Sequence, residues 1–158
     1  TQQTKRDLGD NYREASSAPV VRKMVEELKR PGKRFGAGFY DYPTDSRKRL
    51  WSGLREHFPL ANPTPNVDEI RSRLLVIQAL ETARCLEEGV LTDPADGDIG
   101  SILGWGFPPW TGGTLSYIDT VGIKAFVAEC ERLTDHHGAR FAPSAWLKAR
   151  AAAGQSFY

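Results

Sequence analysis

Apolar residues recur along most of this chain at the three- and four-residue spacing of an amphipathic α-helix. A first helix is predicted to open at Ala18-Pro19, because proline suits the first helical turn, and to end at Pro31-Gly32. Its apolar side chains share one face: Val20, Val21, Met24, Val25 and Leu28. The aromatic, turn-rich residues 33–43 are predicted to form a loop or a short extended piece.

A further helix is predicted from about Asp45 to Phe58, with Leu50, Trp51 and Leu54 on its apolar side. Three prolines follow between residues 59 and 65. Proline stiffens an extended backbone, so this segment is typical of a semi-rigid linker.

The longest helical pattern runs from Asn66 to about Glu88. Asn66 stands in the cap position, Glu69 follows three residues later as in a capping box, and Gly89 can provide the left-handed stop. Residues 74–80 are apolar nearly all the way round the helix. Such a helix is usually wrapped by neighbours, which predicts that it is the central helix of its domain.

Five more segments complete the pattern. A rigid aromatic loop is predicted over residues 104–113, and Pro143 precedes the last helix. The helical segments are 93–103, 114–120, 122–133 and 144–153. No run of alternating polar and apolar residues is long enough to favour a strand, so the predicted fold class is all-α.

The composition limits the classes of protein to which this chain can belong. At 158 residues, with 40% hydrophobic residues and 21 basic against 20 acidic side chains, the chain resembles an ordinary globular domain. The densest basic cluster, Arg47-Lys48-Arg49, is interpreted as a solvated helix face and is too small to predict nucleic-acid binding. Glu81 and Arg84 either pair with each other or remain a solvated charge couple.

Other features of the composition concern the compartment. No apolar run approaches the roughly 20 residues of a membrane span, and no basic and apolar leader is visible. A chain that starts at Thr1 fits an excised piece of a longer protein. Cys85 and Cys130 lie in apolar helical patterns without metal-binding spacing, which favours two buried, reduced thiols in a cytosolic protein.

The sequence shows no pattern of residues that is typical of a catalytic site. Adjacent His136 and His137 point in different directions and favour a helix end over a metal site. The acidic residues Asp93, Asp96 and Asp98 lack the spacing of a calcium loop and are interpreted as a cap with first-turn charges. The short glycine motifs at residues 36–38 and 104–106 lack the strand and helix of a dinucleotide fingerprint. We therefore expect no catalytic, cofactor-binding or metal residue in this chain.

Two stretches resemble a known family. Residues 34–43, RFGAGFYDYP, resemble the GxGFYxY signature that closes the first C-terminal helical domain of 3-hydroxyacyl-CoA dehydrogenases. Residues 73–122 resemble the second such domain of multifunctional dehydrogenase/hydratase enzymes, the fatty oxidation complex α-subunit type, through LEEG, an acidic turn, GxGFPP and a double glycine. Residues 44–65 match no pattern of that family.

The resemblance implies a layout. Residues 1–43 would finish the first C-terminal helical domain, 44–65 would be a linker, and 66–158 would form the second. Each domain would be a helical bundle of the 3-hydroxyacyl-CoA dehydrogenase C-terminal type, which is like the C-terminal domain of 6-phosphogluconate dehydrogenase. The hydratase domain, the NAD-binding domain and the catalytic His-Glu pair would lie upstream, so no catalytic residue is transferred to this chain.

The same resemblance implies a function. The whole protein would be a cytoplasmic β-oxidation enzyme that oxidises 3-hydroxyacyl-CoA to 3-ketoacyl-CoA with NAD, with a thiolase subunit as a further partner. The second helical domain would pack on the first as an internal pseudo-dimer partner, and the isolated chain would be inactive. The alternatives are a free-standing helical module that binds acyl-CoA or a protein, and an enzyme in its own right.

The aromatic loop supplies the candidate interface. Phe107, Pro108, Pro109 and Trp110 concentrate apolar surface on a segment that two prolines stiffen, so the loop loses little entropy on docking. Either the loop packs on its own domain or it contacts another domain. Loss of upstream domains would expose apolar surface, which predicts that the fragment forms a homodimer or a higher oligomer.

Overall fold

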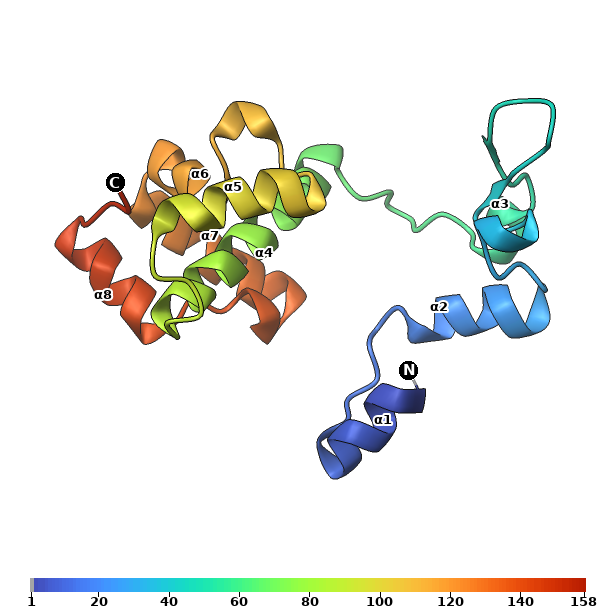
Figure 1. Cartoon of the computed structure of the whole chain (residues 1–158), viewed down its shortest axis with the longest axis horizontal. Helices are drawn as coiled ribbons and strands as arrows, with labels where there is room; N and C mark the ends of the chain where they lie inside the picture. Colours follow the sequence, from blue (N-terminus) through green and yellow to red (C-terminus); the bar gives the residue numbers. More distant parts are fainter. Residues whose placement is uncertain (1) are drawn as a thin grey trace. The chain divides into compact units, whose positions relative to one another are not determined.

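The computed structural model describes residues 2–158 and divides into two compact units, Thr1–Asn62 and Pro63–Tyr158. Helices make up nearly all the regular structure of the described residues, and the one sheet consists of two strands of two residues each. The all-α prediction is therefore confirmed. Figure 1 labels α1–α3 in the first unit and α4–α8 in the second.

The first unit begins with short helices. These are α1 (Gln2–Leu8), the 3₁₀ turn η1 (Gly9–Asn11), α2 (Ala18–Arg22) and the π-helical turn η2 (Lys23–Glu27). The helix predicted from Ala18 is confirmed, although it continues as a π-turn in which the Leu28 N–H donates to the Lys23 carbonyl at 3.0 Å. Met24 is buried, whereas Val20, Val21 and Val25 are exposed.

A small hairpin follows in the first unit. It contains the 3₁₀ turn η3 (Lys33–Phe35), then β1 (Tyr40–Asp41) and β2 (Arg49–Leu50), which pair antiparallel. A single helical turn, α3 (Leu54–His57), comes after it. The expectation of a loop or a short extended piece over residues 33–43 is confirmed. The helix predicted from Asp45 to Phe58 is wrong over its first half, because residues 49–50 form hydrogen bonds with β1 instead.

The boundary between the units falls between Asn62 and Pro63, inside the proline-rich segment. Residues 49–57, which lie within the predicted linker 44–65, form part of the first unit through β2 and α3. The predicted linker segment thus contains regular structure of its own. The assignment of the two units to two domains of the family remains a prediction.

The second unit is a cluster of five helices joined by short turns. Its elements are α4 (Val67–Glu87), α5 (Pro94–Trp105), η4 (Pro109–Thr111), α6 (Thr114–Val121), α7 (Ile123–His137), η5 (Ala139–Phe141) and α8 (Ala145–Ala153). All the helices predicted here are confirmed. Three begin at a side chain that accepts a backbone N–H, namely Asn66, Asp93 and Ser144.

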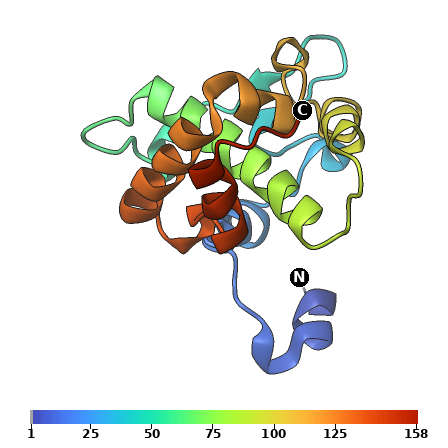
Figure 2. The ribbon, with the colours of Figure 1, turned by 90° about the vertical axis from the view of Figure 1, so that its left-hand side faces the viewer.

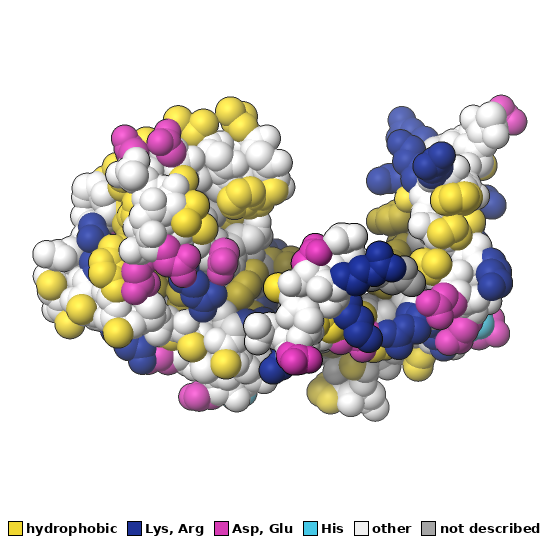
Figure 3. Space-filling view, turned by 60° about the horizontal axis from the view of Figure 1, so that its bottom comes forward, with side chains coloured by type: hydrophobic (Ala, Val, Ile, Leu, Met, Phe, Trp, Pro, Cys, Tyr) yellow, Lys and Arg dark blue, Asp and Glu magenta, His cyan; other side chains and the backbone are white. Residues whose placement is uncertain are grey.

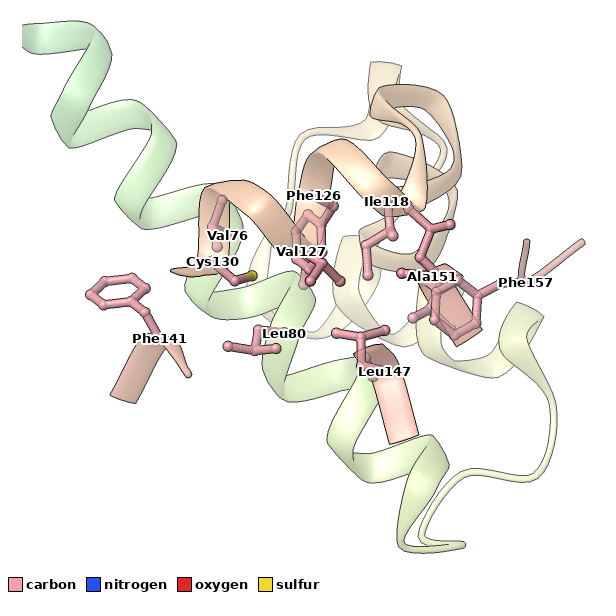
Figure 4. Close-up of a cluster of buried hydrophobic side chains, with 14 of the residues drawn as sticks. Val76, Leu80, Ile118, Phe126, Val127, Cys130, Phe141, Leu147, Ala151 and Phe157 are labelled. Carbon is pink, nitrogen blue, oxygen red and sulfur yellow. The ribbon is translucent and has the colours of Figure 1, made fainter. Parts of the chain in front are cut away.

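The core of the second unit lies where α4, α6, α7 and α8 meet. Figure 4 shows Leu80 of α4 among Phe126, Val127 and Leu147, all of which are buried. The tail after α8, dark red in Figure 2, returns toward α6 and buries Phe157 in the same core. Helix α4 is central as predicted, but it is not wrapped all round, because Ile70 and Leu74 are exposed within this unit.

Glu69 has a different role from the predicted one. The Asn66 side chain caps α4 through the Asp68 N–H at 2.7 Å, but the Glu69 carboxylate binds Arg132 at 2.7 Å and His137 at 2.8 Å. Both partners belong to α7. The capping-box interpretation is therefore wrong: Glu69 joins α4 to α7. Glu81 and Arg84 do pair, at 2.9 Å.

Candidate protein interface

The aromatic loop after α5 is anchored by one buried ring. Helix α5 ends at Gly106, which has a left-handed backbone, and the Phe107 N–H donates to the Ser101 carbonyl at 3.0 Å, as in a Schellman ending. The Phe107 side chain is 1% exposed. It meets Tyr117 edge to face at a centroid distance of 6.1 Å, and Tyr117 meets Phe126 in the same way at 6.3 Å.

The remaining loop residues reach the surface. Pro108 is half-buried, Pro109 is exposed, and the Trp110 side chain is 85% exposed. The Thr111 hydroxyl closes the turn by donating to the Pro108 carbonyl at 2.7 Å. Phe107 must therefore be removed from the predicted interface, because its ring is enclosed by its own unit. Pro108, Pro109 and Trp110 remain a predicted interface.

Helix α5, which precedes the loop, carries further exposed apolar side chains. Ile99 and Leu103 are four residues apart, so they share a helix face, and they are 56% and 80% exposed. Trp105, at the end of α5, is 58% exposed. Large side chains of this kind are depleted on surfaces that face only water and are enriched at contact sites. We name Ile99, Leu103, Trp105 and Trp110 the α5 surface.

A buried carboxylate holds the backbone beneath the loop. Asp98 is 4% exposed and accepts from four donors: the Leu115 N–H (2.6 Å), the Ser116 N–H (3.1 Å), the Ser116 hydroxyl (2.6 Å) and the Tyr158 hydroxyl (2.9 Å). The Leu115 and Ser116 N–H groups lie in the first turn of α6, where they have no hydrogen-bond partner within the helix. The cap residue of α6, Gly113, has no side chain that could accept from them. Asp98 of α5 therefore caps α6 from outside that helix.

Gly113 is required by this arrangement. Its φ of +118° is unfavourable for residues with a side chain, and an added Cβ would lie 2.4 Å from the Cβ of Asp98. Burial, followed by the hydrogen bond to Asp98, raises the pKa of the Tyr158 phenol to about 12. Because its oxygens already accept from these four donors, Asp98 is a structural charge and is poorly placed for acid-base chemistry.

A second polar network joins α4 to α7 at the surface. Hydrogen bonds from Arg132 and His137 lower the pKa of the Glu69 carboxyl. Arg132 also binds Glu129 at 2.7 Å, and the Ser72 hydroxyl donates to Glu129 at 2.5 Å. Each carboxylate has a basic partner, so this network stabilises helix packing and holds no unpaired base.

The remaining reactive side chains are not assembled into a site. Both cysteines are free, Cys130 in the core and Cys85 half-buried, and burial raises the pKa of the Cys130 thiol to about 12. Among residues 2–158, no group of three or more histidine, cysteine or acidic side chains could hold a metal ion. No described helix is both long enough and apolar enough to cross a membrane.

Sequence reasoning missed Asp98, the residue that organises the loop. The acidic run had suggested first-turn charges, and Asp93 does cap α5 through the Ala95 N–H at 2.9 Å. Asp98, however, stands one turn further on, between apolar neighbours. The double glycine before α6, which leaves that helix without a cap of its own, was the one available signal that another residue must provide it.

Comparison with known proteins gives the family context. No family model matches the chain. Subunit alpha of the fatty acid oxidation complex from Shewanella amazonensis is 38% identical over 157 residues, which cover 97% of this chain and 22% of that protein. The same subunit from Shewanella loihica is 36% identical, and that from Vibrio cholerae is 35% identical, each with 97% of this chain and 21% of the relative covered.

The chain thus spans about a fifth of the length of the curated relatives it matches. The match extends over both units, including the hairpin of the first and the α5 surface of the second. Over nearly its whole length, the chain is therefore similar to a segment of the alpha subunits of fatty acid oxidation complexes.

Proposed function

We propose that this chain is the C-terminal helical part of a β-oxidation enzyme that oxidises 3-hydroxyacyl-CoA to 3-ketoacyl-CoA with NAD. Its similarity over 97% of its length to alpha subunits of fatty acid oxidation complexes carries this proposal. The NAD-binding domain, the hydratase domain and the catalytic residues lie in the upstream part, and the complete protein works in the cytoplasm with a thiolase subunit as its partner.

The chain itself has a structural role in this proposal. Its carboxylates at positions 69, 98 and 129 are occupied by hydrogen bonds or ion pairs, which supports a role in packing. The exposed α5 surface supports a contact with another domain, because burial of its four large apolar side chains would be favourable in free energy. In the complete enzyme this surface packs against a neighbouring domain and helps to close the substrate region.

The activity is tested by comparing the 158-residue chain with the complete protein that contains it. With NADH and acetoacetyl-CoA, the complete protein is expected to oxidise NADH, and the isolated chain to give no turnover above the blank. Turnover by the isolated chain would contradict the structural role. A reading frame that begins at this chain, with no upstream dinucleotide-binding sequence, would contradict the proposed enzyme.

The interface is tested by light scattering of the isolated chain. Exposure of the α5 surface is expected to drive the wild-type chain into a homodimer or a larger oligomer. Trp110→Ser is expected to shift the chain toward the monomer, while Val90→Ser, which removes a 69% exposed side chain from the turn after α4, serves as the control. A monomeric wild-type chain, or equal effects of the two substitutions, would refute the interface.

The rival function, a free-standing acyl-CoA-binding module, makes a different prediction. Such a module must bind the acyl chain, so the isolated chain would bind a medium-chain acyl-CoA more tightly than free CoA. The proposed structural role predicts no such preference. Calorimetric titration with both compounds distinguishes the two functions.

A further inference from the structure

The hairpin of the first unit is strongly basic. Residues 29–50 include seven basic side chains and only two acidic ones. Figure 3 shows the dark blue side chains gathered on this part of the first unit. Arg30 pairs with Asp41, and Arg49 lies 3.8 Å from the same carboxylate. One of the two acidic residues is therefore already neutralised, and most of the positive charge has no internal partner.

The hairpin is held in a defined shape by Arg30. Its guanidinium donates to the Gly38 carbonyl at 2.8 Å and to the Tyr40 carbonyl at 3.3 Å, in addition to the Asp41 ion pair. It also stacks on Trp51, with 4.2 Å to the ring centroid. A side chain with four such contacts fixes the base of the hairpin, so the residues near its tip are presented on a supported scaffold.

A hollow of about 460 Å³ lies against this hairpin. Its lining combines two ammonium groups, an aromatic ring, a hydroxyl and a proline: Lys33, Lys48, Tyr42, Ser46 and Pro43. Within the described part of the chain, no carboxylate lies within 4.0 Å of either lysine nitrogen. The Lys48 ammonium lies 4.9 Å from the Tyr40 ring centroid, which restricts the position of that charge.

From this combination we infer that the hairpin hollow binds a nucleotide phosphate, with the phosphate between Lys33 and Lys48 and the base against Tyr42. Ammonium groups are common phosphate ligands, and the Ser46 hydroxyl can donate to a phosphate oxygen. Aromatic rings stack on any nucleobase. This site is separate from the structural role proposed above and does not depend on it.

Binding of ADP to the 158-residue chain, measured by calorimetry at low salt, tests the inference. Lys33→Gln and Lys48→Gln are each expected to weaken binding by about fivefold, the loss typical of one partly exposed ion pair. Arg47→Gln is the matched control, because it removes the same charge next to Lys48 from a side chain that does not line the hollow. It is expected to change the affinity less than twofold.

Further variants distinguish a defined nucleotide-binding site from a diffuse basic surface. Lys48→Arg keeps the charge and should retain most of the affinity, while Tyr42→Leu should weaken ADP binding but leave the weaker binding of inorganic phosphate unchanged. An Arg47→Gln effect as large as that of Lys48→Gln would show a general charge effect and overturn the site. Binding to vesicles of anionic phospholipid without binding of ADP would assign the hairpin to a lipid surface instead and would also overturn it, as would no binding.

Discussion

Replacement of Asp98 by asparagine tests whether one buried carboxylate holds the loop and the start of α6 in place. The carboxylate accepts from four donors, two of them backbone N–H groups of α6. Asparagine keeps the size but turns one acceptor oxygen into an NH₂ donor that must face these donors. It also removes the negative charge at the helix N-terminus.

The expected loss follows from these changes. Hydrogen bonds to a charged group contribute about 1.5–3 kcal/mol, and a side-chain cap contributes about 1 kcal/mol. These terms overlap, and the two hydroxyls can rotate to accept from the new NH₂ group. We therefore expect Asp98→Asn to lower the free energy of unfolding of the second unit by about 2 kcal/mol.

Urea unfolding followed by circular dichroism measures this change. Asp93→Asn is the matched control, because it makes the same chemical change at an exposed cap where asparagine is an equally good residue, and it should alter stability by less than about 0.5 kcal/mol. Equal stabilities of the Asp98→Asn and Asp93→Asn proteins would refute the buried-cap reasoning.

Three further predictions concern the core, pH and thiol reactivity. Phe107→Ala should destabilise the second unit by about 3–4 kcal/mol through the cavity it leaves, whereas Trp110→Ala should cost under about 0.5 kcal/mol by the same urea assay. Because the pKa of Glu69 is lowered, its contribution to stability is fully present above the ordinary carboxyl pKa and is lost as pH falls through the lowered value. As pH falls, the free energy of unfolding should therefore decrease less steeply for Glu69→Gln than for wild type. Equal dependence of the two stabilities on pH would contradict the network. In the native chain, iodoacetamide should label Cys85 well before Cys130, while urea should abolish the difference, as read by mass spectrometry.

The helices of the second unit could be predicted because their determinants are local. Asn66, Asp93 and Ser144 each accept a backbone N–H within three residues, so the cap and the helix it begins are close in the sequence. The left-handed endings at Gly106 and Gly154 are local in the same sense. A periodic apolar face between such signals leaves few alternatives to a helix.

The two predictions of local structure that were wrong, the helix from Asp45 and the capping box at Glu69, involve partners outside the helical turn on which each prediction rested. Residues 49–50 have a helical pattern but pair with residues 40–41, which the Arg30 side chain holds in place. Glu69 stands at the capping-box position, yet its partners Arg132 and His137 are more than sixty residues away. No helical periodicity indicates such contacts, because they arise only when the chain folds back into a hairpin or when the helices pack.

The sequence by itself determined the all-α class, the helices of the second unit and the relation to fatty acid oxidation alpha subunits, since caps, periodicity and family motifs are read in order along the chain. Only the tertiary structure decided that Phe107 is a core ring while Trp110 faces outward, and that Asp98 caps a helix 16 residues further on. It also brought Lys33 and Lys48 to one hollow. Burial and charge proximity depend on which elements meet in space, and one-dimensional patterns do not contain that information.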